Sequence, residues 1–392
     1  MKKILILICL VGCLGFLSYL GYISYLKTPS QKPILSPNAR ESLPSKRVIG
    51  FLPYWQVAST EGLRFSLLDE VIYFGLHITQ EGEIATRDSD GNRDQGYARF
   101  AATLGALTRA VKGRQTTFSV AIILQDNEKI ETFLQNQNAQ ENLIENVSAL
   151  LTQNTELSGI NLDFEYSGIP GRETIDGYTS FVTDFVNALK IHNPSLTVSV
   201  DITADAIRKT RLYNVESLAK AVDYVILMGY DFYRPASSVA GPVAPLRGKE
   251  IYEYDITTAV ADFLTVVPKE KLLLGVPYYG WDFPTENEAK GSFVEKRPNE
   301  AVALSSYKRN RRLIEESNPT LNFDEESQTP WMVYRDPDTN GVRQVWFENE
   351  VSLEKKYNLV NKESLAGIAI WALGYDGNHE ELWDVLRDKF QK

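Results

Sequence analysis

Hydrophobic positions follow two spacings that alternate along most of the chain. Short β-rich runs, typical of buried strands, occur eight times: Val48–Trp55, Val71–Ile78, Thr117–Ile123, Gly159–Glu165, Thr197–Thr203, Tyr224–Tyr230, Leu272–Tyr278 and Gly367–Trp371. Stretches with helical periodicity lie between or after them: Tyr97–Val111, Ala139–Leu151, Tyr178–His192, Val215–Ala221, Ile256–Leu264, Leu353–Asn361 and Glu380–Phe390. Strands that alternate with helices favour a parallel sheet. Eight such units predict an α/β protein with a (β/α)8 TIM barrel.

The interval between the seventh and eighth predicted strands is too long for a single connection. Residues 281–347 contain a predicted helix at Leu304–Glu316 and two β-like pieces, Trp331–Tyr334 and Gln344–Phe347. Asn340-Gly341 lies between these pieces, and Asn-Gly is a strong hairpin signal. We therefore expect a small α+β insertion between strands 7 and 8 of the barrel.

The N-terminal pattern differs from the rest. An uncharged, mostly apolar run of 23 residues, Ile4–Leu26, follows two lysines, and a helix needs about 20 such residues to cross a bilayer core. We interpret residues 1–27 first as an uncleaved membrane anchor, and second as a cleaved signal, whose apolar core is usually about 7–15 residues long. A lipoprotein signal at Cys13 ranks third. Each interpretation places the remaining chain outside the cytoplasm or at the membrane.

The next segment, residues 28–46, is polar and contains four prolines among several serines. This composition is typical of an extended linker. Periodic structure begins at Arg47, so residues 47–392 form the predicted folded unit, which we expect to be a monomer.

Composition excludes several classes of function. The net charge of −10, from 51 acidic and 41 basic residues, disfavours a nucleic-acid partner. The two cysteines, Cys9 and Cys13, both precede the folded unit, which therefore has no predicted disulfide or cysteine metal site. Three scattered histidines do not indicate a zinc site. We expect neither a metal nor a cofactor.

Acidic residues gather at the end of the fourth predicted strand, which reads Asn161-Leu162-Asp163-Phe164-Glu165. Because side chains alternate along a strand, Asn161, Asp163 and Glu165 are predicted to point into the barrel. The two acids lie about 6–7 Å apart along the strand, so their charges interact and tend to raise one pKa. A general acid at neutral pH needs a raised pKa. The alternative is a buried polar network that only fixes register.

Further candidates follow other strands. The sixth predicted strand ends Met228-Gly229-Tyr230-Asp231, which adds a phenol and an acid, and the eighth ends at Trp371. An indole at a barrel mouth is either a packed core residue or a platform for a sugar. Aromatic residues at other strand ends are candidate stacking surfaces for substrate, with core packing as the alternative: Tyr54, Trp55, Tyr279 and Trp281.

Together these segments resemble glycoside hydrolase family 18, the chitinase family. Its fourth strand carries Asp-x-x-Asp-x-Asp-x-Glu, of which Asp163 and Glu165 are kept, while Ser158 and Asn161 replace the first two Asp. The Met-x-Tyr-Asp of the sixth strand and the Trp that ends the eighth are present. The resemblance covers nearly all of residues 47–392. The Asn-x-Asp-Phe-Glu form is most similar to the branch of bacterial spore-cortex and germination hydrolases.

The resemblance implies retaining hydrolysis assisted by the substrate, an exception to the two-carboxylate scheme. Glu165 would protonate the glycosidic oxygen while the N-acetyl carbonyl attacks the anomeric carbon to give an oxazolinium ion. Asp163 would orient the acetamide and stabilise its positive charge, supported by Asn161. Tyr230 would hydrogen-bond the acetamide oxygen, and Asp231 would hold the distorted sugar. Met228 and Trp371 are candidate substrate-binding residues, with Trp371 as the floor beneath the sugar.

The expected function is that of an exported, membrane-tethered hydrolase acting on β-1,4-linked N-acetylglucosamine polymers. Peptidoglycan is the preferred substrate and chitin the next. A non-hydrolytic, lectin-like glycan-binding protein on the same barrel is the alternative, but lectin-like members commonly lack the acid that Glu165 supplies. A wall-anchoring scaffold would need neither acid.

Overall fold

The computed structural model describes residues 46–112, 114–297 and 300–390. The predicted anchor at 1–27, and all of the predicted linker except its last residue, lie outside this range. Within it, no helix combines the length and apolar character needed to cross a bilayer.

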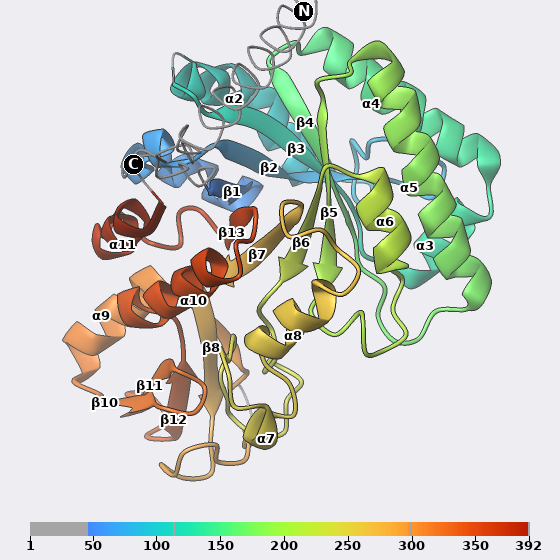
Figure 1. Cartoon of the computed structure of the whole chain (residues 1–392). Helices are drawn as coiled ribbons and strands as arrows, with labels where there is room; N and C mark the ends of the chain where they lie inside the picture. The colour runs from blue at the N-terminus through green and yellow to red at the C-terminus, as the bar shows by residue number, and fades with distance from the viewer. Residues whose placement is uncertain (1–45, 113, 298–299, 391–392) are drawn as a thin grey trace, which may run out of the picture. The chain divides into compact units, whose positions relative to one another are not determined.

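Eight parallel strands form a closed barrel in the order β1-β13-β7-β6-β5-β4-β3-β2. The strands are β1 (Arg47–Pro53), β2 (Glu70–His77), β3 (Thr117–Leu124), β4 (Leu157–Phe164), β5 (Thr197–Thr203), β6 (Tyr224–Met228), β7 (Leu272–Pro277) and β13 (Gly367–Trp371). Each contains most of one strand predicted from the sequence. The predicted TIM barrel is therefore confirmed, and Figure 1 shows its strands and surrounding helices.

The helices match the predicted periodic stretches, with additions. They are α2 (Gln95–Val111), α3 (Asn127–Leu134), α4 (Gln137–Gln153), α5 (Arg172–His192), α6 (Val215–Ala221), α7 (Lys249–Tyr252), α8 (Ile256–Phe263), α9 (Tyr307–Ser317), α10 (Glu350–Lys362) and α11 (Glu381–Phe390). The short α3 was not predicted, although Asp126 caps it by accepting a hydrogen bond from the Lys129 N–H at 3.0 Å. The first predicted strand was too long, because 3-10 helix η1 (Tyr54–Gly62) begins after Pro53.

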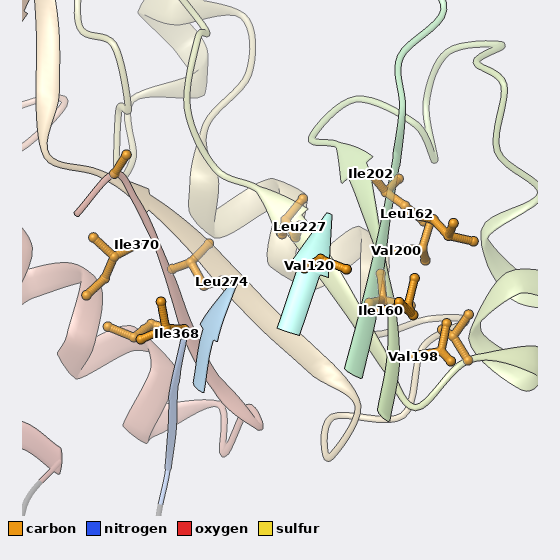
Figure 2. Close-up of a cluster of buried hydrophobic side chains, with 14 of the residues drawn as sticks. Val120, Ile160, Leu162, Val198, Val200, Ile202, Leu227, Leu274, Ile368 and Ile370 are labelled. Carbon is orange, nitrogen blue, oxygen red and sulfur yellow. The ribbon is translucent and has the colours of Figure 1, made fainter. Parts of the chain in front are cut away.

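Side-chain alternation gives each barrel strand two buried faces. One face packs against the surrounding helices and includes Val120, Ile160, Val200 and Ile368, which Figure 2 labels. The other face fills the barrel with a smaller apolar cluster that contains Ile49, Phe51, Ile72, Phe74, Ala121, Ile123, Ile226, Leu273 and Ala369. Burial on both faces explains why the strands are almost continuously hydrophobic. It also makes any polar side chain inside the barrel conspicuous.

The insertion is a five-stranded antiparallel sheet in the order β10-β11-β12-β8-β9. Its strands are β8 (Tyr279–Pro284), β9 (Ala303–Ser306), β10 (Thr320–Asp324), β11 (Thr329–Arg335) and β12 (Val342–Trp346). The predicted hairpin is present, since β11 and β12 pair on either side of Asn340-Gly341. Only Tyr278 separates β7 from β8, so the first residues of β8 stay at the end of the barrel strands. Figure 1 shows the insertion on the side toward which β5 and β6 point.

Candidate active site

The acids of β4 occupy the barrel interior and its mouth. Asn161 pairs in register with Ala121 of β3, and Asp163 with Ile123, both members of the interior cluster. Asn161 and Asp163 are buried. Glu165 follows the strand, and its N–H donates to the Leu124 carbonyl at 3.0 Å. The predicted inward alternation therefore holds for Asn161 and Asp163, and the ladder bond fixes Glu165 at the end of the barrel strands.

Gln125 joins the two acids and was not found by sequence reasoning. Its Nε2 donates to Asp163 Oδ2 at 3.1 Å and to Glu165 Oε1 at 2.6 Å. One amide group therefore holds both carboxyl groups in a single arrangement. The available signal was its position directly after β3, where a polar side chain reaches the barrel mouth.

Asp201 of β5 is a third buried acid, and sequence reasoning missed it too. Asn161 Nδ2 donates to Asp201 Oδ1 at 2.9 Å and to Ser199 Oγ at 3.1 Å. Asn161 and Ser199 are register partners on neighbouring strands. The signal was the alternation Ser199-Val200-Asp201-Ile202 within a predicted strand, which places two polar side chains on one face.

Burial and mutual repulsion raise the pKa values of these acids. Burial, with the charges of Glu165 and Asp201, raises the pKa of Asp163 well above its usual range. Burial raises the pKa of Glu165, with a contribution from Asp231, although the Gln125 hydrogen bond opposes it. Burial raises the pKa of Asp201 to about 8 against the hydrogen bond from Asn161. A raised pKa keeps a carboxyl protonated at higher pH, so this group of acids can donate a proton near neutral pH.

Asp231 is held by two aromatic donors from the insertion. Tyr279 Oη donates to Asp231 Oδ1 at 2.7 Å, and Trp281 Nε1 donates to the same oxygen at 2.9 Å. Asp231 has φ of 58°, a left-handed conformation that Asp tolerates better than most residues. Burial raises the pKa of Asp231, although the two donors and Arg234 oppose the shift. Tyr279 is only 2% exposed, so it offers a hydroxyl to Asp231 and no free ring face.

Tyr230 lies among the acids. Its pKa is raised well above the usual value by burial and then by the charges of Asp201, Asp163, Glu165 and Asp231. A Cβ atom on Gly275 of β7 would lie 3.1 Å from Tyr230 Cε1, so this glycine leaves room for the phenol. The part of the chain that is described provides no hydrogen-bond acceptor for the Tyr230 hydroxyl, which leaves it free to donate to a ligand.

Aromatic rings gather at the ends of β1 and β13. The Trp371 ring centroid is 4.6 Å from that of Phe74 and 6.4 Å from that of Trp55, and Tyr54 packs on Trp55 at 4.9 Å. Trp55 is 46% exposed, whereas Met228 is 8% exposed. Trp55 and the half-buried Trp371 can thus present ring faces to a ligand, while Met228 mainly supports the strand end.

One family model matches most of the folded unit. The model described as "Glycosyl hydrolases family 18" matches residues 47–376. The chain belongs to glycosyl hydrolase family 18. It is therefore a glycosidase of a family to which sequence reasoning had assigned it.

Family 18 relatives carry names that indicate different activities. The chain is 27% identical over 357 residues to YdhD of Bacillus subtilis (strain 168), provisionally named a sporulation-specific glycosylase, covering 87% of this chain and 77% of YdhD. It is 27% identical over 240 residues to the cortical fragment-lytic enzyme of the same organism, covering 59% of this chain and 49% of that enzyme. The class V chitinase of Nicotiana tobaccum has the same fold, with a TM-score of 0.72, 18% identity and coverage of 88% and 98%.

Ser158 departs from the family 18 pattern at the other end of β4. Its Oγ donates to the Phe118 carbonyl of β3 at 3.1 Å. It is the second residue of β4, seven positions before Glu165, and hydrogen-bonds a neighbouring strand rather than an acid. Asn161, the other departure, is hydrogen-bonded to Asp201 instead.

We predict that Gln125→Ala extends activity to higher pH. Gln125 stabilises ionised Glu165, so its removal raises the Glu165 pKa further, and the alkaline limb of the kcat/KM profile moves to higher pH. A hydrogen bond to a charged group contributes about 1.5–3 kcal/mol, so relative activity above the optimum should rise by about tenfold or more. Asn127→Ala is the matched control, because Asn127 donates to the Ser167 carbonyl and not to an acid. A limb that stays in place in Gln125→Ala would contradict the prediction.

Proposed function

We propose that the chain hydrolyses β-1,4 bonds at N-acetylglucosamine residues of peptidoglycan by retaining, substrate-assisted catalysis. The observation that carries the proposal is the pair Asp163 and Glu165, joined by one amide at the barrel mouth with raised pKa values. Chitin-type polymers are the second choice of substrate. The Bacillus relatives are named a sporulation-specific glycosylase and a cortical fragment-lytic enzyme, which favours peptidoglycan. The chitinase with the same fold is the reason to retain chitin as the second choice.

The geometry supports a role for each residue. Glu165, solvent-accessible and with a raised pKa, donates its proton to the glycosidic oxygen. Asp163, deeper on the same face of β4, stabilises the positive charge that develops on the N-acetyl group as its oxygen attacks the anomeric carbon. Tyr230 has a free hydroxyl among the acids and donates to the acetamide oxygen. Asp231, held by Tyr279 and Trp281, accepts a hydrogen bond from the sugar.

Two features bind the sugar without taking part in bond cleavage. Trp371 forms the floor beneath the distorted sugar, and the exposed Trp55 stacks on a neighbouring unit. Asn161, expected from the sequence to support Asp163, hydrogen-bonds Asp201 and Ser199 instead and is fully buried below the mouth.

The decisive test uses the full-length chain in detergent with three substrates. Peptidoglycan and N-acetylglucosamine hexamers should yield new reducing ends by mass spectrometry, while the fully deacetylated hexamer should not be cut, because it lacks the acetamide nucleophile. The substrate that yields more new reducing ends identifies the natural substrate class. Binding of glycans without cleavage at any pH would favour the lectin-like alternative. Cleavage of the deacetylated hexamer at equal rate would contradict substrate assistance.

We also propose that residues 1–27 anchor the enzyme with the barrel outside the cytoplasm. The support is the apolar run of 23 residues that follows two lysines. Protease added to intact cells should degrade the barrel while a short N-terminal fragment stays with the membrane fraction. Release of the intact barrel into the medium would indicate a cleaved signal instead.

A further inference from the structure

The carboxyl groups of Asp163 and Asp201 form a buried pair of acids. Both residues are buried, at 3% and 4% exposure, and face the barrel interior from neighbouring strands. Asn161 pairs with Ser199 and Leu162 with Val200, so continuing that register places Asp163 beside Asp201. Adjacent strands lie about 5 Å apart. Two ionised carboxyl groups at such separation in a buried site repel each other strongly.

No cation compensates this pair. Among the described residues, no lysine, arginine or histidine forms a salt bridge with Asp163, Glu165 or Asp201. The ionisable groups that interact with the pair are one acid and three phenols, from the ends of β4 and β6, from α5 and from the segment before α6: Glu165, Tyr230, Tyr178 and Tyr213. The neutral contacts are the amides of Gln125 and Asn161 and the Ser199 hydroxyl. Burial without a cation therefore favours one retained proton on the pair.

Asn161 fixes the geometry between the strands. Both hydrogen bonds from its Nδ2 go to β5, one to Asp201 and one to Ser199. The Asn161 Oδ1 atom can only accept a hydrogen bond. It and the Asp163 Oδ1 atom are both buried, and neither receives a hydrogen bond from the described residues. A carboxyl that keeps its proton is itself a donor. A protonated Asp163 would therefore leave only one of these two buried oxygens as an acceptor without a donor.

We propose that Asp201 is a positioning residue of the active site, which orients Asn161 and shares one proton and one negative charge with Asp163. This inference rests on the proposed function. When positive charge develops on the acetamide, the negative charge of the pair moves to Asp163 and the proton rests on Asp201. The pair takes up or releases no net proton. Asp201 thus supplies from β5 a second interior carboxyl that β4, with Asn161, does not provide.

Asp201→Asn tests the inference, because it keeps the size and an acceptor oxygen for Asn161 but removes the shared charge. Asp163 then ionises at lower pH. Above the pH at which the wild-type pair loses its shared proton, Glu165 in the variant faces one buried carboxylate instead of two, so the alkaline limb of kcat/KM also moves to lower pH. Activity at pH 8 relative to the optimum should fall about tenfold, as one pKa unit is a factor of ten. A purely structural role predicts an equal loss at every pH, which would overturn the proposal.

Two further variants separate charge from hydrogen bonding. Ser199→Ala removes the other acceptor of the Asn161 amide without changing any charge, so its alkaline limb should stay in place. The exchange Asn161→Asp with Asp201→Asn keeps one amide and one carboxyl in contact, with their positions swapped, and should restore the limb lost in Asp201→Asn. An exchange variant that is folded but keeps the limb of Asp201→Asn would count against a shared charge.

A measurement without turnover distinguishes failure of this inference from failure of the proposed function. Carbon-13 NMR of labelled Asp carboxyl groups in the full chain follows the titration of Asp163, assigned through Asp163→Asn. In wild type the signal should include a step that follows ionisation of Asp201, and in Asp201→Asn this step should be absent and the Asp163 titration should move to lower pH. Absence of hydrolysis together with this change would reject the function and keep the coupling. An identical Asp163 titration in both proteins would overturn the coupling.

Discussion

Replacing Glu165 with Gln should leave a folded protein that loses nearly all turnover of natural substrate. The amide keeps the size of the side chain and can still contact Gln125, but it has no proton to give to the glycosidic oxygen. General acid catalysis contributes about 10²–10⁴ in rate, so kcat should fall by that factor with little change in substrate binding. Steady-state kinetics on N-acetylglucosamine oligomers measures it.

The leaving group provides an internal control for this variant. A 4-nitrophenyl glycoside releases a weakly basic phenolate that needs little protonation, so Glu165→Gln should lose far less activity on it than on the natural oligomer. Glu141→Gln, an exposed change on α4, should behave as wild type on both. Equal losses by Glu165→Gln on the two substrates would remove Glu165 from the role of general acid.

Replacing Asp163 with Asn should lower kcat by about 10²–10³, the usual cost of losing one group that stabilises developing charge at an active site. The loss should be similar for the 4-nitrophenyl glycoside and the natural oligomer, because both form the charged acetamide intermediate. This pattern is the opposite of that expected for Glu165→Gln. Comparing the two variants on both substrates therefore separates proton donation from charge stabilisation.

Asp163→Asn should also move the pH profile. Asp163 and Glu165 repel each other, so removing one charge lowers the pKa of Glu165, and Glu165 loses its proton at lower pH. The alkaline limb then shifts to lower pH, the reverse of the Gln125→Ala shift. Asp184→Asn on the exposed face of α5 is the matched control. Wild-type rates and an unmoved limb in Asp163→Asn would exclude Asp163 from the mechanism.

The barrel was predictable because its signals are local. Eight hydrophobic runs alternated with helical periodicity, and each run appears as a strand. Residues whose signals were weak or short were misassigned: η1 interrupts the predicted first strand after Pro53, and the eight-residue α3 was not found. In both places a single proline or capping residue decides the local structure, and such a signal is small beside hydrophobic periodicity.

Some residues of the candidate site could likewise be predicted from local patterns, and others could not. Asn161 and Asp163 could be placed inside the barrel from alternation alone, and Tyr230, Asp231 and Trp371 from their positions at strand ends. Tyr279 was considered as a stacking surface, yet its hydroxyl is bound to Asp231 and its ring is buried. The contact joins residues 48 positions apart in the sequence. No local pattern carries that information.

The sequence by itself determined the barrel, its insertion, the family and the acids of β4, because strand alternation and short motifs act within a few residues. Only the tertiary structure decided which groups control those acids. Pairing of β4 with its two neighbours brings Gln125, directly after β3, and Asp201 of β5 to either side of β4, and the insertion brings Tyr279 and Trp281 to Asp231. Hydrogen bonds and burial set a pKa through space, so the protonation of the site follows from the pairing of these strands and their burial in the barrel.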